Sequence, residues 1–167
     1  MAHPRPLDRP LRCAVLTVSD TRTPDTDQSG ALIQTGLTEA GHQIADYRIV
    51  ADDPAVIRDL VRQWAQRADL DAVIVNGGTG IAPRDTTYDA LEALLEKTLP
   101  GFGELFRQLS FQDIGSRAMA SRAVAGVYRD KLLFSLPGSS KAVKLAMDAL
   151  ILPELPHLVS LLHQSSP

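Results

Sequence analysis

Short apolar runs alternate along this chain with segments in which apolar residues recur at helical spacing. The runs are rich in Val, Leu and Ala, which is typical of strands buried on both faces of a sheet. They occupy residues 12–19, 43–50, 71–75, 123–127 and 132–136. Amphipathic helices are predicted at residues 32–40, 54–64, 86–95, 102–109 and from 143 onward. Because strands and helices alternate, we expect βαβ crossovers and an α/β fold, a three-layer αβα domain with a mainly parallel sheet.

Several residues indicate where these helices begin and end. Gly41 follows the first helix, at the position where glycine adopts the left-handed conformation that ends a helix. Asp53 precedes Pro54, which predicts an N-cap followed by proline in the first turn. Thr86 and Asp89 have the spacing of a capping box, in which each side chain bonds the backbone of the other residue.

The composition is that of one soluble globular domain. The chain has 167 residues, of which 44% are hydrophobic and 22% charged. A chain of this length buries enough surface to fold without disulfides or metals. The one cysteine, Cys13, excludes a disulfide framework and a Cys-rich zinc site. We assign residues 12–167 to the domain and residues 1–11, where three prolines disfavour a helix, to a flexible N-terminal arm.

Hydropathy and charge limit the location and the partners. No apolar run approaches the roughly 18 residues that a membrane span requires. The N-terminus also lacks the continuous apolar region of a signal peptide. We therefore expect a cytoplasmic protein with no membrane partner. The formal net charge of −3 at pH 7 argues against nucleic acid as a partner. It leaves room for a small anionic ligand, because local donors dominate at short range.

The loop at residues 76–85, NGGTGIAPRD, carries the strongest chemical signal. Ligands of open parallel sheets bind beyond the carboxyl ends of the strands, and this loop follows a predicted strand directly. Its small residues are Gly77, Gly78, Thr79 and Gly80. Glycines let consecutive backbone amides approach an anion, whereas a tight turn with positive φ is the alternative interpretation. The nearby arginine and aspartate favour a phosphate-binding loop, although the sequence matches neither a Walker A motif nor GxGxxG.

Three aspartates are candidate ligands for Mg²⁺, which takes one or two carboxylates together with phosphate oxygens. Asp53 is explained as the N-cap before Pro54. Asp52 is then not needed as a cap and is the better metal ligand. Asp85 ends the glycine-rich loop, and a cap for the helix that begins near Thr86 is an equal alternative for it.

Other polar residues at predicted strand ends and helix starts complete the candidate site. They are Ser19, Asp20, Ser29, Gly30, Gly138 and Ser139. A cap or a turn is the alternative role for these residues. Arg107, Arg117 and Arg122 are candidates for contact with an anion, although a solvated arginine is commoner. The four histidines are scattered and no G-x-S-x-G motif occurs, which argues against a zinc site and a serine hydrolase site.

Motifs in a fixed order along the chain resemble one known family. They are VLTVSD, D-x-SG-x-L, EAGH, IV-x-DD, NGGTGIAPRD, GFGELFR-x-LS, IGSRAMASRAVAG and LPGS. Together they span about residues 12–153 and resemble the molybdenum cofactor biosynthesis proteins of the MoaB/MogA type, which share a domain with the G domain of gephyrin. GFGELFR-x-LS and IGSRAMASRAVAG are most similar to the MoaB branch. Asn76 and Tyr88 stand where the family more often has Thr and Pro.

The resemblance implies a specific activity. Members of the family bind molybdopterin, a pterin dithiolene with a terminal phosphate, and the active ones use Mg-ATP to adenylylate that phosphate and release pyrophosphate. By this resemblance Asp52 and Asp85 are the catalytic acids and the Mg²⁺ ligands. The implied phosphate loop and pocket consist of Gly77, Gly78, Thr79, Gly80, Ser19, Asp20, Ser29, Gly30, Gly138 and Ser139. The implied assembly is a homotrimer or homohexamer, with GFGELFR and the apolar tail 155–162 as interface candidates.

Three functions remain open from the sequence. The first is a molybdopterin adenylyltransferase, the second a non-catalytic protein that binds molybdopterin or a precursor, and the third an oligomeric interaction protein. The presence of both Asp52 and Asp85 favours the first, since a binding protein has no need of metal-binding acids. The third is disfavoured because the sequence shows no long linker or second domain that would recruit partners.

Overall fold

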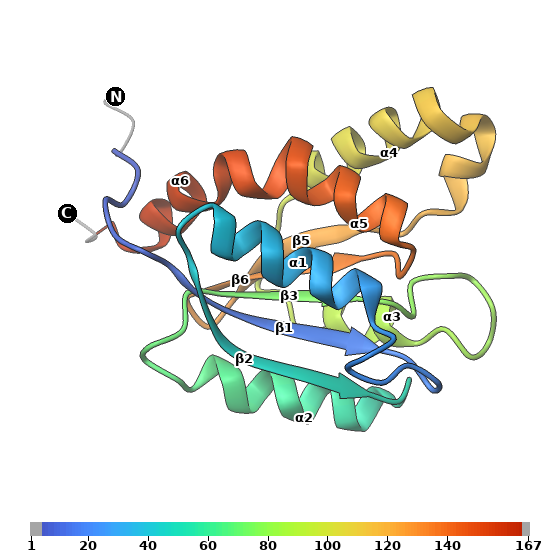
Figure 1. The fold of residues 1–167 in the computed structure, drawn as a ribbon, viewed down its shortest axis with the longest axis horizontal. Helices are drawn as coiled ribbons and strands as arrows, with labels where there is room; N and C mark the ends of the chain where they lie inside the picture. Colours follow the sequence, from blue (N-terminus) through green and yellow to red (C-terminus); the bar gives the residue numbers. More distant parts are fainter. Residues whose placement is uncertain (1–4, 165–167) are drawn as a thin grey trace.

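A computed structural model describes residues 5–164, and its centre is a six-stranded sheet with helices on both faces (Figure 1). The strands are β1 (Arg12–Val18), β2 (Gln43–Val50), β3 (Ala72–Asn76), β4 (Lys97–Thr98), β5 (Val124–Tyr128) and β6 (Lys131–Leu136). Their order in the sheet is β2-β1-β3-β6-β5-β4. The pairs β1–β2, β1–β3 and β3–β6 are parallel, which confirms the predicted α/β fold.

The far edge of the sheet is antiparallel rather than parallel. β5 and β6 form a hairpin whose two turn residues, Arg129 and Asp130, have φ angles of 45° and 62°. Two positive φ angles are what a two-residue turn needs to match the twist of its strands. β4 pairs with β5 in the antiparallel sense and has two residues, too few to produce a hydrophobic pattern in the sequence. The expected crossover connection therefore does not join the last two predicted strands.

The helices form the outer layers of the three-layer sandwich. They are α1 (Gln28–Glu39), α2 (Pro54–Ala65), α3 (Thr87–Glu92), α4 (Pro100–Ile114), α5 (Ser140–Ala146) and α6 (Leu152–Leu162). A 3-10 turn, η1 (Gly115–Ala120), follows α4, and a π-helical segment, η2 (Met147–Ile151), joins α5 to α6. Figure 1 shows α2 and α3 on one face of the sheet and α1, α4, α5 and α6 on the other.

Two hydrophobic cores lie on the two faces of the sheet. Alternate residues of β1 belong to different cores, because successive side chains of a strand point to opposite faces. Cys13 and Val15 pack with α1, α4 and α5, whereas Ala14 and Leu16 pack with α2 and α3. Burial on both faces explains why the central strands are continuous apolar runs in the sequence.

Helix ends agree with the sequence predictions at two of three places. Gly41 has a φ of 87° and its amide bonds the carbonyl of Thr38, which ends α1 as predicted. Asp53 caps α2 through the amides of Ala55 and Val56 at 2.9 and 3.3 Å. The predicted capping box at the start of α3 is wrong. Both of its side chains bond to groups distant in the sequence, as described below.

The segment before β1 is attached to the domain from Leu7 onward. Arg9 forms two hydrogen bonds of 2.8 and 2.9 Å with the carboxylate of Asp71, and Leu11 is fully buried. Leu7 packs against the same core as α1. Residues 1–4 of the predicted arm lie outside the described residues.

One helix is more apolar than the sequence analysis recognised. Residues 140–162 run through α5, η2 and α6, and the segment is long and apolar enough to cross a membrane by length and composition, since 18 consecutive residues within it have a mean hydropathy of 1.5. The statement that no segment approaches this length is therefore corrected. Val143, Ile151 and Val159 of this helix are buried in the core beside the sheet. A helix that covers a sheet has this composition because one of its faces is apolar.

Candidate active site

The loops that follow β1, β2, β3 and β6 converge at one edge of the sheet. The amide of Ser19 after β1 donates to the carbonyl of Val50 at the end of β2, at 2.9 Å. The amide of Gly77 after β3 donates to the carbonyl of Leu136 at the end of β6, at 3.0 Å. Adjacent parallel strands thus bring the four predicted loops together, as the topology of an open sheet requires.

The glycines after β3 have conformations and close neighbours that exclude a side chain. Gly77 and Gly78 have φ angles of 103° and 65°, in the region that favours glycine. A Cβ atom at Gly77 would collide with the carbonyl oxygen of Val18, and one at Gly78 with the hydroxyl of Thr87. The tight turn that was the alternative interpretation is therefore present in the loop. It does not exclude an anion site, because the same turn orients the amides.

The loop presents free backbone donors. Within residues 5–164 no acceptor bonds the amides of Gly78, Thr79, Gly80 or Ile81. The carbonyl oxygens of Thr79 and Gly80, by contrast, accept hydrogen bonds of 3.1 and 2.8 Å from Arg122. A run of free amides with occupied carbonyls has a local positive potential. Such an arrangement is suited to binding phosphate.

Asp52 connects the end of β2 to the start of α3. Its Oδ1 accepts hydrogen bonds from the hydroxyl of Thr86 at 2.6 Å, the amide of Thr86 at 3.3 Å and the hydroxyl of Thr87 at 3.4 Å. Asp52 is therefore not the cap of α2, as predicted, and it instead bonds the residues at the start of α3, a helix distant in the sequence. Its other oxygen, Oδ2, borders the loop, since a Cβ built on Gly78 would lie 2.6 Å from it.

Asp85 lies at the other end of the same loop. A Cβ built on Gly80 would lie 2.5 Å from Asp85 Oδ2. The alternative role of Asp85 as a cap for α3 is not observed, because no hydrogen bond joins its carboxylate to another residue within 5–164. Asp52 and Asp85 thus flank the glycine loop, one at Gly78 and one at Gly80. The described residues contain no group of three or more His, Cys, Asp or Glu side chains that could hold a metal ion by themselves.

Asp20 and Arg84 form an ion pair beside the loop. Arg84 donates from Nε to Asp20 Oδ2 at 2.6 Å, while Asp20 Oδ1 accepts from the amide of Asp52 at 3.3 Å. The hydrogen bond from Arg84 lowers the pKa of Asp20 below its ordinary value. Ser19 accepts from the amides of Thr21 and Arg22, so it has the turn role that was its alternative. Asp20 thus joins Asp52 to Arg84 of the loop, whereas the side chain of Ser19 bonds only within its own turn.

The sequence analysis missed Asp27, a buried carboxylate at the start of α1. It is the N-cap of α1, where it accepts from the amide of Gly30 at 2.9 Å and from the hydroxyl of Tyr47 at 2.5 Å. Burial raises the pKa of Asp27, but the hydrogen bonds and the charge of Arg22 outweigh it and hold the pKa below its ordinary value. Asp27 precedes Gly30 by three residues, which is the spacing between an N-cap residue and the N3 residue whose amide it binds. The sequence therefore contained a signal for this cap.

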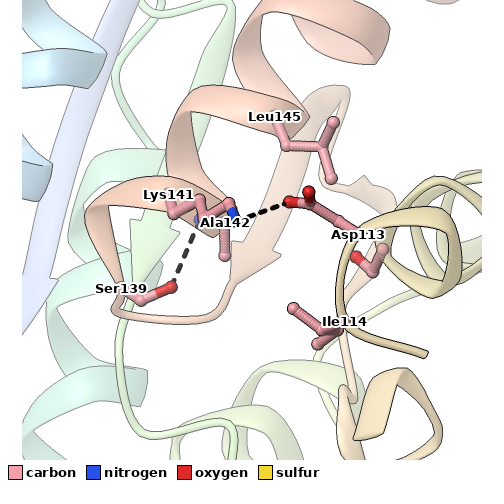
Figure 2. A pocket seen from close by; sticks show the side chains of 7 residues that line it. Asp113, Ile114, Ser139, Lys141, Ala142 and Leu145 are labelled. Atoms are coloured by element: carbon pink, nitrogen blue, oxygen red, sulfur yellow. Dashed lines mark hydrogen bonds and ion pairs between the residues drawn. The ribbon is translucent and has the colours of Figure 1, made fainter. Parts of the chain in front are cut away.

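The loop after β6 is held by groups from α1. The carbonyl oxygen of Gly138 accepts from the hydroxyl of Ser29 at 2.7 Å and from Arg22 at 3.2 Å. Ser29 therefore does not cap α1; it connects α1 to this loop. Ser139 is the N-cap of α5, and its Oγ accepts from the amide of Ala142 at 3.2 Å (Figure 2).

A cavity of about 310 Å³ extends from the glycine loop toward α4 and α5. Its lining includes Thr79, Gly80, Phe106, Ile114, Ser139 and Ala142. A smaller hollow shares part of this lining, and Figure 2 shows Asp113 of α4 and Lys141 of α5 facing one another across it, 3.0 Å apart. The cavity is polar at the loop and apolar at α4, which suits a ring system that carries an anionic group.

The three candidate arginines differ in their contacts. Arg107 donates to the carbonyls of Ser121 and Ala123 and, within residues 5–164, forms no hydrogen bond with the loop. Arg117 is exposed on η1 and bonds no group in residues 5–164. Of the three, Arg122 contacts the glycine loop. Its guanidinium donates to the carbonyl oxygens of the loop and is therefore not free to bind an anion.

Comparison with known proteins agrees with this geometry. A family described as "Probable molybdopterin binding domain" matches residues 14–157. The chain is 54% identical over 158 residues to molybdenum cofactor biosynthesis protein B of Halalkalibacterium halodurans, covering 94% of this chain and 93% of that protein. A crystal structure of a molybdenum cofactor biosynthesis protein B has a TM-score of 0.92 and 50% identity, covering 95% of this chain and 99% of that one.

A more distant relative has the same fold. The crystal structure of the tungsten cofactor synthesizing protein MoaB from Pyrococcus furiosus has a TM-score of 0.85 and 32% identity, covering 95% of this chain and all of that chain. The resemblance inferred from the sequence motifs is therefore confirmed. The chain belongs to the molybdopterin-binding MoaB/MogA family of molybdenum cofactor biosynthesis proteins.

Proposed function

We propose that this chain binds molybdopterin at the strand ends and transfers the adenylyl group of ATP to its terminal phosphate, with release of pyrophosphate. One observation carries the proposal. Two carboxylates, Asp52 and Asp85, flank a glycine loop in which the amides of residues 78–81 have no acceptor within residues 5–164. A site that only binds a phosphate needs the amides. Carboxylates beside them would repel the anion unless a cation lies between.

Asp52 and Asp85 fit Mg²⁺, because carboxylate oxygens are its preferred protein ligands and two of them leave room for phosphate oxygens. When bound, the ion would neutralise phosphate charge and make the α-phosphorus of ATP more electrophilic. Both carboxylates border the loop through their Oδ2 atoms. Asp85 Oδ2 accepts no hydrogen bond from another described residue. Asp52 Oδ2 accepts one long hydrogen bond, of 3.4 Å, from the amide of Thr86.

The residues of the chain act mainly by positioning and neutralising charge. The terminal phosphate of molybdopterin forms a new P–O bond to the α-phosphorus of ATP, and the bond to the bridging oxygen breaks to release pyrophosphate. A phosphate monoester is ionised near neutral pH, so no side chain has to remove a proton. The free amides of the loop stabilise the negative charge, and the cavity beside them orients the pterin end.

A second candidate function is supported by the contacts of Asp52. Its hydrogen bonds to Thr86 and Thr87 give it a structural reason to be present without any metal. A protein that binds molybdopterin without catalysing adenylyl transfer would keep the same loop. Asp85 does not have such a structural partner among the described residues, so it distinguishes the two candidates more sharply than Asp52.

A single-turnover assay tests the proposal. The purified protein is mixed with molybdopterin and ATP, with Mg²⁺ or with EDTA, and adenylylated pterin and pyrophosphate are both quantified. We expect equal amounts of the two products with Mg²⁺ and none with EDTA. Asp85→Asn should lower the rate by about a hundredfold, or ~3 kcal/mol. Molybdopterin binding without either product would support the binding protein instead.

We also propose that the chain acts in the cytoplasm as a homotrimer or homohexamer. Exposed apolar side chains on α4 support an assembly: Leu105, Phe111 and Ile114 are 50%, 61% and 48% exposed. The apolar tail contributes less surface than expected, because Leu155 and Val159 are buried in the core. Sedimentation equilibrium would measure the mass, and a monomer at micromolar concentration would contradict the assembly.

A further inference from the structure

Arg122 connects the glycine loop to α3. Its Nε donates to the carbonyl of Thr79 at 3.1 Å and its Nη2 to the carbonyl of Gly80 at 2.8 Å. Its two terminal nitrogens also donate to the two carboxylate oxygens of Asp89, at 3.0 and 3.2 Å. The guanidinium lies 4.6 Å from the ring centre of Tyr88. The planar fork of arginine makes these contacts at once, which a lysine ammonium cannot do.

These bonds determine where the loop amides point. In a planar trans peptide the carbonyl and the following amide point in opposite directions. With the carbonyls of Thr79 and Gly80 held on Arg122, the amides of Gly80 and Ile81 are directed away from it. A peptide next to glycine flips easily, because no Cβ restricts the rotation. The loop therefore needs an external contact to keep its donors on the ligand side.

Arg122 is already occupied by these contacts and is not free to bind an anion. Four hydrogen bonds use its donors, and its side chain is 25% exposed, whereas that of Asp89 is 63% exposed. Asp89 touches neither the loop nor the cavity. In this structure Asp89 holds the guanidinium in the plane that the two carbonyls require.

We propose that Arg122 is a positioning residue of the phosphate loop, and that Asp89 acts on the loop through Arg122. This inference rests on the proposed function, because it assigns the loop amides to a phosphate of molybdopterin or of ATP. Arg122 keeps the amides of Gly80 and Ile81 directed toward that phosphate before the ligand arrives. Binding then costs less, because the loop does not have to be reordered.

Asp89→Asn tests the proposal through the direction in which the affinity for a phosphate ligand changes. The substitution removes a negative charge near the anion site, so electrostatics alone predicts tighter binding of a phosphate. The positioning role predicts weaker binding, because an amide cannot accept both hydrogen bonds of the guanidinium. Arg122→Lys keeps the positive charge and removes the fork, so it separates geometry from charge in the same way.

A matched control is available in Arg117, which lies on η1 and bonds no described group. Arg117→Gln removes one positive charge without touching the loop. Dissociation constants for molybdopterin and for ATP with Mg²⁺ are measured by anaerobic equilibrium ultrafiltration. Hydrogen exchange at residues 78–81 and thermal unfolding are measured on the same proteins.

We expect Arg122→Lys to weaken binding of at least one of the two ligands by about tenfold or more. Asp89→Asn should weaken the same ligand by about threefold. Both should speed exchange at residues 78–81, and Arg117→Gln should match the wild type. If an Arg122 variant fails to fold, Asp89→Asn decides, since its side chain is exposed.

Three outcomes would overturn the inference. Unchanged or tighter binding by Asp89→Asn, or wild-type affinity in Arg122→Lys, contradicts the positioning role and leaves the proposed function intact. A wild-type protein that binds neither molybdopterin nor ATP contradicts both.

Discussion

The carboxylate of Asp52, which follows β2, holds the first turn of α3: its Oδ1 lies 2.6 Å from the hydroxyl oxygen of Thr86. The two residues are 34 positions apart, and the contact crosses from one strand end to the next. A carboxylate is favourable there, because the amino end of a helix has a partial positive charge. Asp52 therefore has a structural role at Oδ1 and borders the glycine loop with Oδ2.

The two roles of Asp52 can be separated by comparing two substitutions. In Asp52→Asn the remaining carbonyl oxygen still accepts from Thr86, so the melting temperature should stay close to that of the wild type. Adenylyl transfer should fall by about a hundredfold, because a neutral amide is a poor Mg²⁺ ligand. In Asp52→Ala both roles are lost, and stability should also fall by about 1–2 kcal/mol.

Urea unfolding and the single-turnover assay measure the two effects independently. An Asp52→Asn protein with full activity would show that the carboxylate is only a cap.

The sequence predicts the loops of the site but not how they are connected. The strand-end position and the three glycines identify Gly77, Gly78 and Gly80 through local chemistry. The contacts from Asp52 to Thr86 and from Arg122 to the loop depend on which strands are neighbours, which no local pattern contains. The capping box failed for this reason. Asp52 satisfies the start of α3 from outside, and Asp89 binds Arg122 instead.

The glycines of the loop should tolerate substitution very differently from glycines elsewhere. In Gly77→Ala the methyl group would meet the carbonyl oxygen of Val18, and the φ of 103° is strained for any residue with a Cβ. We expect a loss of about 2–4 kcal/mol in stability and no molybdopterin binding. Gly101→Ala is the control, since nothing lies within 4 Å of a Cβ there and the residue is in the first turn of α4.

Chemical denaturation of both variants checks this comparison. A Gly77→Ala protein as stable as the wild type would mean that the loop adopts another conformation in solution.

The predictable part of the fold is the part with regular periodicity. The strands β1, β3 and β6 are central and buried on both faces, so their apolar runs are clear in the sequence. β4 is a two-residue edge strand, and its pairing is decided by the adjacent hairpin rather than by its own residues. β5 is antiparallel to β6 because the turn at Arg129 and Asp130 is too short for a crossover connection. The short spacing between these two predicted strands already favours a hairpin.

Asp71 should make the protein sensitive to acid. Burial raises the pKa of its carboxyl, but the hydrogen bonds from Arg9 and from the amide of Arg12 outweigh it, so the pKa lies below the ordinary value. A lowered pKa in the folded state contributes stability above the unfolded value of about 3.9. That contribution is lost as the pH falls through the folded pKa. Asp71→Asn should therefore cost about 2 kcal/mol at pH 7 and flatten the loss of stability below pH 4.

Urea unfolding between pH 3 and pH 7 follows this dependence. Asp25→Asn is the control, because Asp25 is exposed and its carboxylate forms no hydrogen bond or ion pair with another residue within 5–164. If Asp71→Asn and the wild type lose stability in parallel as the pH falls, another carboxylate is responsible.

Cys13 should be chemically inert in the folded protein. It is fully buried in β1, and burial raises the pKa of its thiol to about 12, with the negative charge of Asp71 acting in the same direction. Only the thiolate reacts with disulfide reagents, and the buried sulfur is exposed only when the strand opens. At pH 8 the native protein should react with a disulfide reagent about a hundredfold slower than the urea-unfolded chain, or slower still. The rate should rise with sub-denaturing urea if opening limits it. Rapid reaction in native buffer would show that β1, which carries the first loop of the site, opens independently of the rest of the sheet.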